Sequence, residues 1–246
     1  HILANTIPNC KSYDATYAYE LAVIIQDGLE RMYGKKENFF YYITTMNENY
    51  NHPSIPEGVE QGIIAGVYKV DSTKLTKNKK KSINVNLMGA GTILHEVIAA
   101  SKILADDYSI TSDIWSLTSI NELVRDGQEI DRWNMLNPEK NKKMAYIERI
   151  LEDSNGPFVI ATDYIKSYGE QLRKYIPDDL HVLGTDGFGR SDGRESLREF
   201  FEVDAANIIL AALYELKVAG KVKASLVEKA IKDLKLDPDK SNPLLN

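Results

Sequence analysis

A polar loop in the first quarter of the chain holds side chains that could do chemistry. The run 39–45 is aromatic and β-branched, which predicts a buried strand, and four polar or aromatic residues follow it: Asn47, Glu48, Asn49 and Tyr50. Ligands bind at the carboxyl ends of strands in open α/β sheets. We therefore expect these residues to line a substrate channel or a subunit interface, although loops are also polar simply because they are exposed.

A second polar segment, GTDGFGRSDGR at 184–194, overlaps the end of another predicted strand. Its glycines permit tight backbone turns. Four of its charged side chains can form a charge-assisted network: Asp186, Arg190, Asp192 and Arg194. We expect this network to hold a domain or subunit contact instead of taking part in chemistry.

Short motifs that mark common catalytic sites are absent or incomplete. The turn Met88–Leu94, MGAGTIL, joins a predicted strand to a predicted helix, but Leu94 stands where a third glycine would complete a dinucleotide-binding turn. A plain strand-to-helix turn is therefore the favoured interpretation. Phosphate-loop, serine hydrolase and zinc protease sites have no anchor, because the sequence contains no GxxxxGKS, GxxxxGKT, GxSxG or HExxH.

The histidines and the single cysteine suggest no metal site. Of the four histidines, we expect His95, on an apolar helix, and His181, at the start of a strand, to be structural. Cys10 has no CxxC neighbour and no disulfide partner, which argues against structural zinc and suits a reducing compartment. The expected location is the cytoplasm.

Composition excludes several classes of partner. The 246 residues are 43% hydrophobic, enough for one large core or two modest ones, and the formal net charge is −6. Nucleic acid or anionic lipid would require a basic excess that is missing here. No run of about 18 apolar residues is present, so no membrane span is expected. The opening HILANTIPNCKSYD has neither an initiator methionine nor a signal-peptide pattern, and it reads as the middle of a longer sequence.

Two units of unequal size are expected to position these residues. Helical spacing predicts a helix at 14–33, before the strand at 39–45, and residues 57–70 predict a short helix leading into an edge strand. Such a piece cannot satisfy a parallel sheet alone, so residues 1–70 are expected to be the tail of one α/β domain. The lysine-rich run 71–82 predicts a linker, and the net negative charge disfavours a nucleic-acid contact there.

The remaining residues, 83–246, alternate predicted strands with predicted helices. Such alternation implies a mostly parallel sheet covered by helices on both faces. We therefore expect an α/β domain here, preceded by the tail of the other. Strands are predicted at INVNLMG, DIWSLTS, PFVIATD and HVLGTD, and helices at TILHEVIAASKILADDY, 146–151, 164–175 and after residue 186.

Four long segments make a family resemblance specific. They are TIPNCKSYDATYAYELAVIIQDGLERMYG, YYITTMNENY, TSINELVRDGQEIDRWNML and GTDGFGRSDGRESLREFFEVDA. In this order they resemble consecutive segments of the homodimeric, bacterial-type pyruvate dehydrogenase decarboxylating component, a transketolase-like thiamine diphosphate enzyme. The resemblance covers essentially the whole chain. It implies the end of a pyrimidine-binding domain, 1–70, followed by a transketolase-like carboxy-terminal domain, 83–246.

The resemblance also implies where the cofactors and the catalytic groups lie. Relatives hold thiamine diphosphate and Mg²⁺ with a GDG motif that this sequence lacks, so both are expected to be bound mainly by residues upstream of this chain. Relatives carry a histidine-rich segment before TIPN, and its last histidine, which faces the cofactor's reactive carbon, matches His1. His1 is therefore a catalytic candidate that can handle protons or stabilise negative charge. A tag remnant is the other interpretation of His1.

The activity and the partners follow from the same resemblance. The family decarboxylates pyruvate and reductively acetylates the lipoyl group of the dihydrolipoyl acetyltransferase component, which feeds acetyl-CoA synthesis. The implied partners are a second copy of the enzyme, the acetyltransferase component and pyruvate, with no nucleic acid and no membrane. We expect this chain to be inactive alone. The alternative is a dimerisation or assembly module with no catalytic residue of its own.

Overall fold

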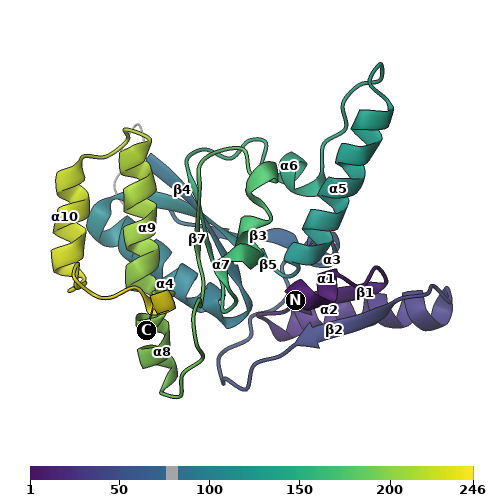
Figure 1. Ribbon diagram of the computed structural model, residues 1–246, viewed down its shortest axis with the longest axis horizontal. Coiled ribbons are helices and arrows are strands. Elements are labelled where there is room, and N and C mark those ends of the chain that lie inside the picture. Colours follow the sequence, from purple (N-terminus) through teal and green to yellow (C-terminus); the bar gives the residue numbers. More distant parts are fainter. Residues whose placement is uncertain (76–82, 246) are drawn as a thin grey trace.

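Two sheets organise the chain in the computed structural model, which describes residues 1–75 and 83–245 (Figure 1). Strands β1 (Cys10–Asp14) and β2 (Phe40–Thr44) pair in parallel as a two-stranded sheet. The larger sheet has the order β3-β5-β4-β6-β7, in which β3 is antiparallel to β5 and the other pairs are parallel. The predicted α/β fold with a mostly parallel sheet is thus confirmed. Its strands are β3 (Val67–Ser72), β4 (Ile83–Ala90), β5 (Ile110–Leu117), β6 (Phe158–Ala161) and β7 (Leu180–Leu183).

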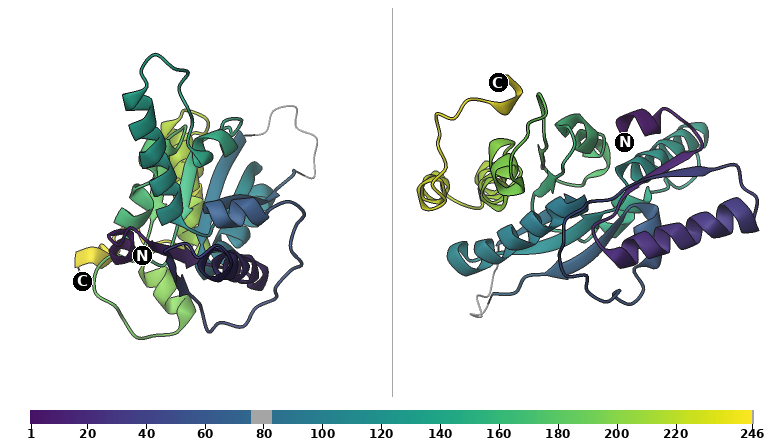
Figure 2. Two further views of the ribbon diagram at one scale, coloured as in Figure 1. Left: turned by 90° about the vertical axis from the view of Figure 1, so that its right-hand side faces the viewer. Right: turned by 90° about the horizontal axis from the view of Figure 1, so that it is seen from below.

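Helices cover both faces of the larger sheet (Figure 2). Along β4 the side chains alternate, so that Val85 and Leu87 join one hydrophobic core whereas Met88 and Ala90 join the other. The first core is completed by α4 (Leu94–Tyr108), α9 (Ala205–Val218) and α10 (Ala224–Asp233), and the second by α5 (Ile120–Leu136), α6 (Tyr146–Ile150) and α7 (Lys166–Glu170). The helix predicted at 164–175 is interrupted, because α7 ends at Glu170 and a separate 3₁₀ turn spans Arg173–Tyr175.

The smaller sheet differs from the sequence-based prediction at its first strand. The predicted helix 14–33 begins too early, since residues up to Asp14 form β1 and the helix α2 spans Ala18–Leu29. Glu20 fixes this start, because its Oε2 accepts the backbone N–H groups of Thr16 and Tyr17 at 2.6 and 2.9 Å. The other helices of this part are α1 (Ile2–Asn5) and α3 (Glu60–Ala65), and a π-helical turn, Glu30–Gly34, extends α2.

Strand β2 forms close to its predicted position but is not the buried strand that its composition suggested. Phe40 is 42% exposed and Tyr42 is 46% exposed. The reason is that β2 has β1 as its single neighbour among the described strands, so one edge and part of one face stay open.

Strand β3 lies on the larger sheet, although the sequence placed most of it with the first unit. Its pairing with β5 includes Asp71 and Ser72, which were predicted to begin the linker. The rest of that predicted linker includes 76–82, which lies outside the described residues. The division of the chain into two domains stays a prediction, with β3 assigned by its pairing to the second sheet.

The two parts meet around the buried carboxylate of Glu20. Tyr68 on β3 and Ser116 on β5 donate hydroxyl hydrogen bonds to its Oε1 at 2.6 and 2.7 Å. Burial raises the pKa of Glu20 despite these donors. Four donors to one side chain compensate the cost of burying it, so Glu20 joins α2 firmly to the larger sheet.

Gly66, between α3 and β3, gives a test of this junction. Its φ is +115°, and a Cβ built there would lie 2.3 Å from the carbonyl oxygen of Ser119. We expect Gly66→Ala to lower the free energy of unfolding by more than about 3 kcal/mol, because the clash adds to backbone strain of about 1–3 kcal/mol. Urea denaturation measures the loss.

Gly58→Ala is the matched control for Gly66→Ala. Gly58 has φ +76° with nothing within 4 Å of a built Cβ, so its substitution introduces backbone strain without a clash. Equal losses in the two variants would contradict the close packing described here.

Candidate functional site

Three tyrosine rings surround the imidazole of His1. The centroid of its imidazole is 4.7 Å from that of Tyr164, 5.3 Å from that of Tyr42 and 5.5 Å from that of Tyr168, against which it stacks. The side-chain amide of Asn121 donates to the His1 carbonyl at 2.8 Å. Both the backbone and the ring of His1 are therefore held in place.

A chain of hydrogen bonds connects His1 to a buried carboxyl. The Nε2 atom of His1 lies 3.0 Å from Thr44 Oγ1 and 3.2 Å from the Tyr164 hydroxyl. The Thr44 hydroxyl donates to Asp14 Oδ1 at 2.7 Å, and the Tyr164 hydroxyl lies 3.2 Å from Thr44. Asp14 and Thr44 are register partners at the ends of β1 and β2, so strand pairing places them side by side.

The Asp14 carboxyl is buried where the two sheets approach each other. Burial raises its pKa to about 7, the hydrogen bond from Thr44 opposes this, and the charge of Asp163 adds to it. Gly91 packs against it so closely that a Cβ there would lie 2.5 Å from Asp14 Oδ2. The MGAGTIL segment is thus a strand-to-helix turn whose glycine makes room for this carboxyl.

An apolar cavity of about 520 Å³ opens beside His1. Exposed side chains surround it, among them Leu3, which is 82% exposed. An imidazole on the wall of such a cavity can exchange a proton with a ligand bound there. The lining residues are His1, Ile2, Leu3, Ala4, Ile7, Cys10, Phe40, Tyr42, Tyr164, Ile165 and Tyr168.

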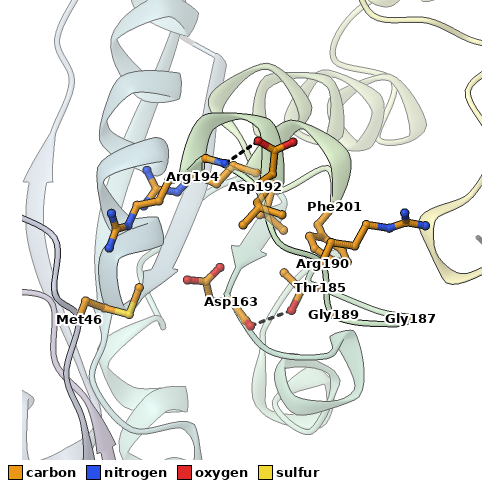
Figure 3. Close-up of a pocket in the computed structure, with 13 residues that line it drawn as sticks. Met46, Asp163, Thr185, Gly187, Gly189, Arg190, Asp192, Arg194 and Phe201 are labelled. Carbon is orange, nitrogen blue, oxygen red and sulfur yellow. Dashed lines mark hydrogen bonds between the residues drawn. The ribbon is translucent and has the colours of Figure 1, made fainter.

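A second, more polar cavity of about 580 Å³ lies at the carboxyl ends of β6 and β7 (Figure 3). Asp163 follows β6 and Thr185 follows β7, and the Thr185 hydroxyl donates to the Asp163 carbonyl at 2.7 Å. Met46, from the loop after β2, closes one side. Burial raises the pKa of the Asp163 carboxyl, and the charge of Arg198 opposes that rise.

The two polar segments singled out from the sequence meet at this cavity. Asn47 Oδ1 accepts a hydrogen bond from Arg194 Nη2, and Glu48 pairs with Arg194 at 3.3 Å. Glu48 also pairs with Arg198 at 2.8 Å, and Arg198 pairs in turn with Glu96 of α4 at 3.0 Å. The side chain of Arg198 is 11% exposed, so it forms the inner part of this cluster.

The other predicted residues of these segments have separate partners. The Tyr50 hydroxyl donates to the Thr16 carbonyl, and Asn49 is exposed. Asp186 accepts the backbone N–H of Lys166 at 3.0 Å, while Asp192 accepts that of Gly193 at 2.6 Å.

The four charged residues of 184–194 do not form the network that the sequence suggested. Among the described residues no ion pair joins Asp186, Arg190, Asp192 and Arg194 to one another. Figure 3 shows Arg190 and Arg194 extending to opposite sides of the cavity, and the Arg190 guanidinium lies 4.4 Å from the centroid of the Phe200 ring. Asp186 and Asp192 accept nearby backbone N–H groups, Arg190 lies over the Phe200 ring, and Arg194 pairs with the loop 47–50. Their role at an interface stays a prediction.

The remaining histidines have internal contacts. His181 Nδ1 lies 2.9 Å from Glu215 Oε1. The His95 ring lies 4.3 Å from the Tyr50 ring, and burial lowers the pKa of His95. Within the described part of the chain, no group of three or more histidine, cysteine and acidic residues could hold a metal ion. No helix among those residues is long and apolar enough to span a membrane.

Sequence reasoning missed Asp14, Thr44, Tyr164 and Arg198. The signal for the first three was present, because Asp14 and Thr44 end strands and Tyr164 closely follows β6. The rule that ligands bind at the carboxyl ends of strands applies to them as well as to the loop 47–50. Arg198 gives no such signal, since it lies within the helix α8 (Arg194–Phe200).

Comparison with known proteins matches the two parts of the chain to two family models. Residues 1–53 match the pyruvate dehydrogenase E1 component middle domain. Residues 66–204 match the transketolase-like TK C-terminal domain. The second match begins just before β3.

Curated relatives match over nearly the full chain. The pyruvate dehydrogenase E1 component of Escherichia coli strain K12 is 53% identical over 247 residues, which is 100% of this chain and 27% of the relative. That of Pseudomonas aeruginosa strain PAO1 is 49% identical over 245 residues, 99% of this chain and 27% of the relative. The chain therefore spans about a quarter of the length of these relatives.

Solved structures share the fold at low identity. Transketolase from Leishmania mexicana has a TM-score of 0.57 and 14% identity, over 88% of this chain and 27% of that one. A split-gene transketolase, described as an inactive beta4 tetramer, has a TM-score of 0.52, again at 14% identity, over 87% of this chain and 60% of that one. At this identity the likeness supports the fold alone.

Asp14→Asn tests the buried carboxyl through the pH dependence of stability. The folded-state pKa of about 7 lies above the ordinary value of 3.8. The stability from this group is therefore full below about pH 4 and is lost as pH rises through 7. We expect the stability of the wild type, relative to Asp14→Asn, to fall over this range by up to about 1.4 kcal/mol per pH unit. Denaturation at several pH values measures this, and a constant difference would contradict it.

Arg198→Met tests the cluster that joins the loop 47–50 to α4. Removing Arg198 leaves Glu96 without its ion-pair partner and Glu48 with Arg194 alone, so we expect a loss of about 3 kcal/mol in the free energy of unfolding. The control is Arg173→Met, whose pair with Glu170 is exposed and should be worth less than about 1 kcal/mol. Similar losses in both variants would show that Arg198 does not organise the cluster.

Proposed function

The chain belongs to the transketolase-like C-terminal domain family, and from this premise we propose that it is part of a pyruvate dehydrogenase E1 component. The observation that carries the proposal is the order of the matches. A pyruvate dehydrogenase E1 middle-domain segment at 1–53 precedes the C-terminal domain match at 66–204. The relatives named as pyruvate dehydrogenase E1 components align with both parts in one stretch.

The proposed activity belongs to the longer enzyme that would contain this chain. It decarboxylates pyruvate and reductively acetylates the lipoyl group of the dihydrolipoyl acetyltransferase component, which feeds acetyl-CoA synthesis. Thiamine diphosphate, when bound, supplies the electron sink for decarboxylation. This chain alone is inactive in the proposal, because most of the cofactor-binding residues lie upstream of it.

The described residues fit the reactive end of that cofactor better than its diphosphate. The cavity beside His1 is mostly apolar, with the imidazole on its wall. Nowhere in the described ranges does an acidic or histidine cluster offer a site for the magnesium ion. We propose that the diphosphate and Mg²⁺ are bound mainly by residues upstream of this chain, as the family resemblance implies.

His1 is the catalytic residue in this proposal. Its Nδ1 is buried and has no hydrogen-bond partner among the described residues, while its Nε2 is held by Thr44 and Tyr164. A fixed imidazole with one unsatisfied nitrogen suits proton transfer at a bound substrate. The apolar side chains of 1–7 continue the cavity around the ring.

Two kinds of partner contact are proposed. Asn47, Glu48 and Arg194 lie together at the edge of the second cavity, where a substrate channel or a second copy of the enzyme would pass. The exposed apolar side chains around His1 also favour the alternative of a dimerisation or assembly module. We propose the cytoplasm as the compartment, since Cys10 is free and buried, and propose no nucleic-acid or membrane contact.

His1→Ala in the longer enzyme separates the catalytic role from the assembly role. We expect kcat to fall about 100-fold or more while the dimer stays intact by sedimentation, because proton transfer is lost without loss of an interface. His181→Ala is the control, since His181 lies on β7 and contacts Glu215. Unchanged turnover in His1→Ala would leave the assembly module as the better account.

A further inference from the structure

We propose that Asp14 and Thr44 are positioning residues that fix the tautomer of His1, with the proton on Nε2 and the lone pair on Nδ1. Tyr164 completes the arrangement. The inference rests on the proposed catalytic role of His1 and selects among its possible actions. In this form neutral His1 first accepts a proton through Nδ1 and only then becomes a donor.

The Asp14 carboxylate determines which groups in this network donate hydrogen bonds and which accept them. An ionised carboxylate accepts hydrogen bonds and donates none, whereas a threonine hydroxyl has one hydrogen to give. The Thr44 hydroxyl donates to Asp14 Oδ1 at 2.7 Å, the shortest of its contacts. The Thr44 oxygen therefore faces His1 as an acceptor.

The protonation of His1 Nε2 then follows from the positions of the neighbouring hydroxyl hydrogens. The Tyr164 hydroxyl lies 3.2 Å from both Thr44 Oγ1 and His1 Nε2, so its one hydrogen can go to either, whereas the Thr44 hydrogen is already given to Asp14. If His1 Nε2 carried a lone pair, that pair would face the Thr44 oxygen at 3.0 Å with no hydrogen between them. A proton on Nε2 removes this repulsion and gives Nε2–H an acceptor.

The other ring nitrogen is covered by protein in this structure. Nδ1 of His1 is buried without a partner in the described part of the chain. A buried acceptor without a donor costs about 1–3 kcal/mol, which a hydroxyl or amine donor would recover once the side chains that cover Nδ1 move aside. The ligand class for this atom is therefore a hydrogen-bond donor, such as a hydroxyl group on the substrate side.

The network depends on the charge of Asp14. Burial raises the pKa of Asp14, the hydrogen bond from Thr44 opposes the rise, and the charges of Asp163 and Glu20 add to it. Above a pH of about 7 the ionised carboxyl imposes the direction described here. When protonated, Asp14 can donate to Thr44, and the Thr44 hydrogen is then free to point toward His1. Donation from Thr44 to Asp14 is therefore maintained only at a pH above the pKa of Asp14.

Nitrogen NMR of the histidine-labelled chain at a pH of about 8, where imidazoles are neutral, tests this directly. Two other histidines supply references. His52 Nδ1 accepts the Ala18 N–H at 3.1 Å, which requires a proton on Nε2, and His181 Nδ1 donates to the Glu215 carboxylate. We expect the two His1 nitrogens to show the pattern of His52. The pattern of His181 would overturn the proposal without any variant.

Thr44→Val removes the acceptor and serves as the second measurement. We expect the His1 signals to move toward a mixture of both tautomers, while those of His52 and His181 stay in place. Thr45→Val is the matched control, because Thr45 is exposed and next to Thr44. A His1 pattern unchanged by Thr44→Val would overturn the positioning role.

Kinetics of the longer enzyme separate this inference from the proposed function. Thr44→Val should lower kcat about 10-fold with little change in KM for pyruvate, as expected for misorientation of a catalytic group. A KM increase at constant kcat would count against positioning. If the NMR result holds and His1→Ala leaves turnover unchanged, the tautomer is fixed as inferred and the catalytic role of His1 fails.

Discussion

The buried carboxyl of Asp14 is the interaction on which the candidate site depends. Its backbone N–H donates to the Thr118 carbonyl at 2.8 Å, which ties the end of β1 to the turn after β5. Its side chain accepts a hydrogen bond from the hydroxyl of Thr44 on β2 and lies against Gly91, which follows β4. A carboxyl at this depth is tolerable only with such partners. The ends of β1, β2 and β4 are therefore fixed relative to one another, and with them the position of His1.

Two chemically different cavities result from this arrangement. Thr44 and Tyr164 belong to the His1 side, which is apolar apart from the imidazole and tyrosine hydroxyls. Met46, two residues after Thr44, and Asp163, immediately before Tyr164, line the polar cavity together with its arginines. One loop from each part of the protein thus serves both cavities.

Sequence patterns predicted the larger sheet well because its inner strands are buried on both faces and read as apolar runs. Strand β1, CKSYD, escaped prediction because it is polar and yet fully buried. Its side chains use hydrogen bonds that sequence does not reveal, such as that from the Asn121 amide to the Ser12 hydroxyl at 2.6 Å. Polar loop 47–50 was recognised, whereas its pairing with Arg194 depends on a contact across 147 positions.

The most direct measurement is a structure of the longer enzyme with thiamine diphosphate and a pyruvate analogue bound. We expect His1 Nδ1 to lie about 3 Å from a hydrogen-bond donor of the bound ligand, while Nε2 keeps its contact with Thr44. A ligand bound away from the apolar cavity, or a His1 Nδ1 that stays covered by protein as it is here, would contradict this expectation.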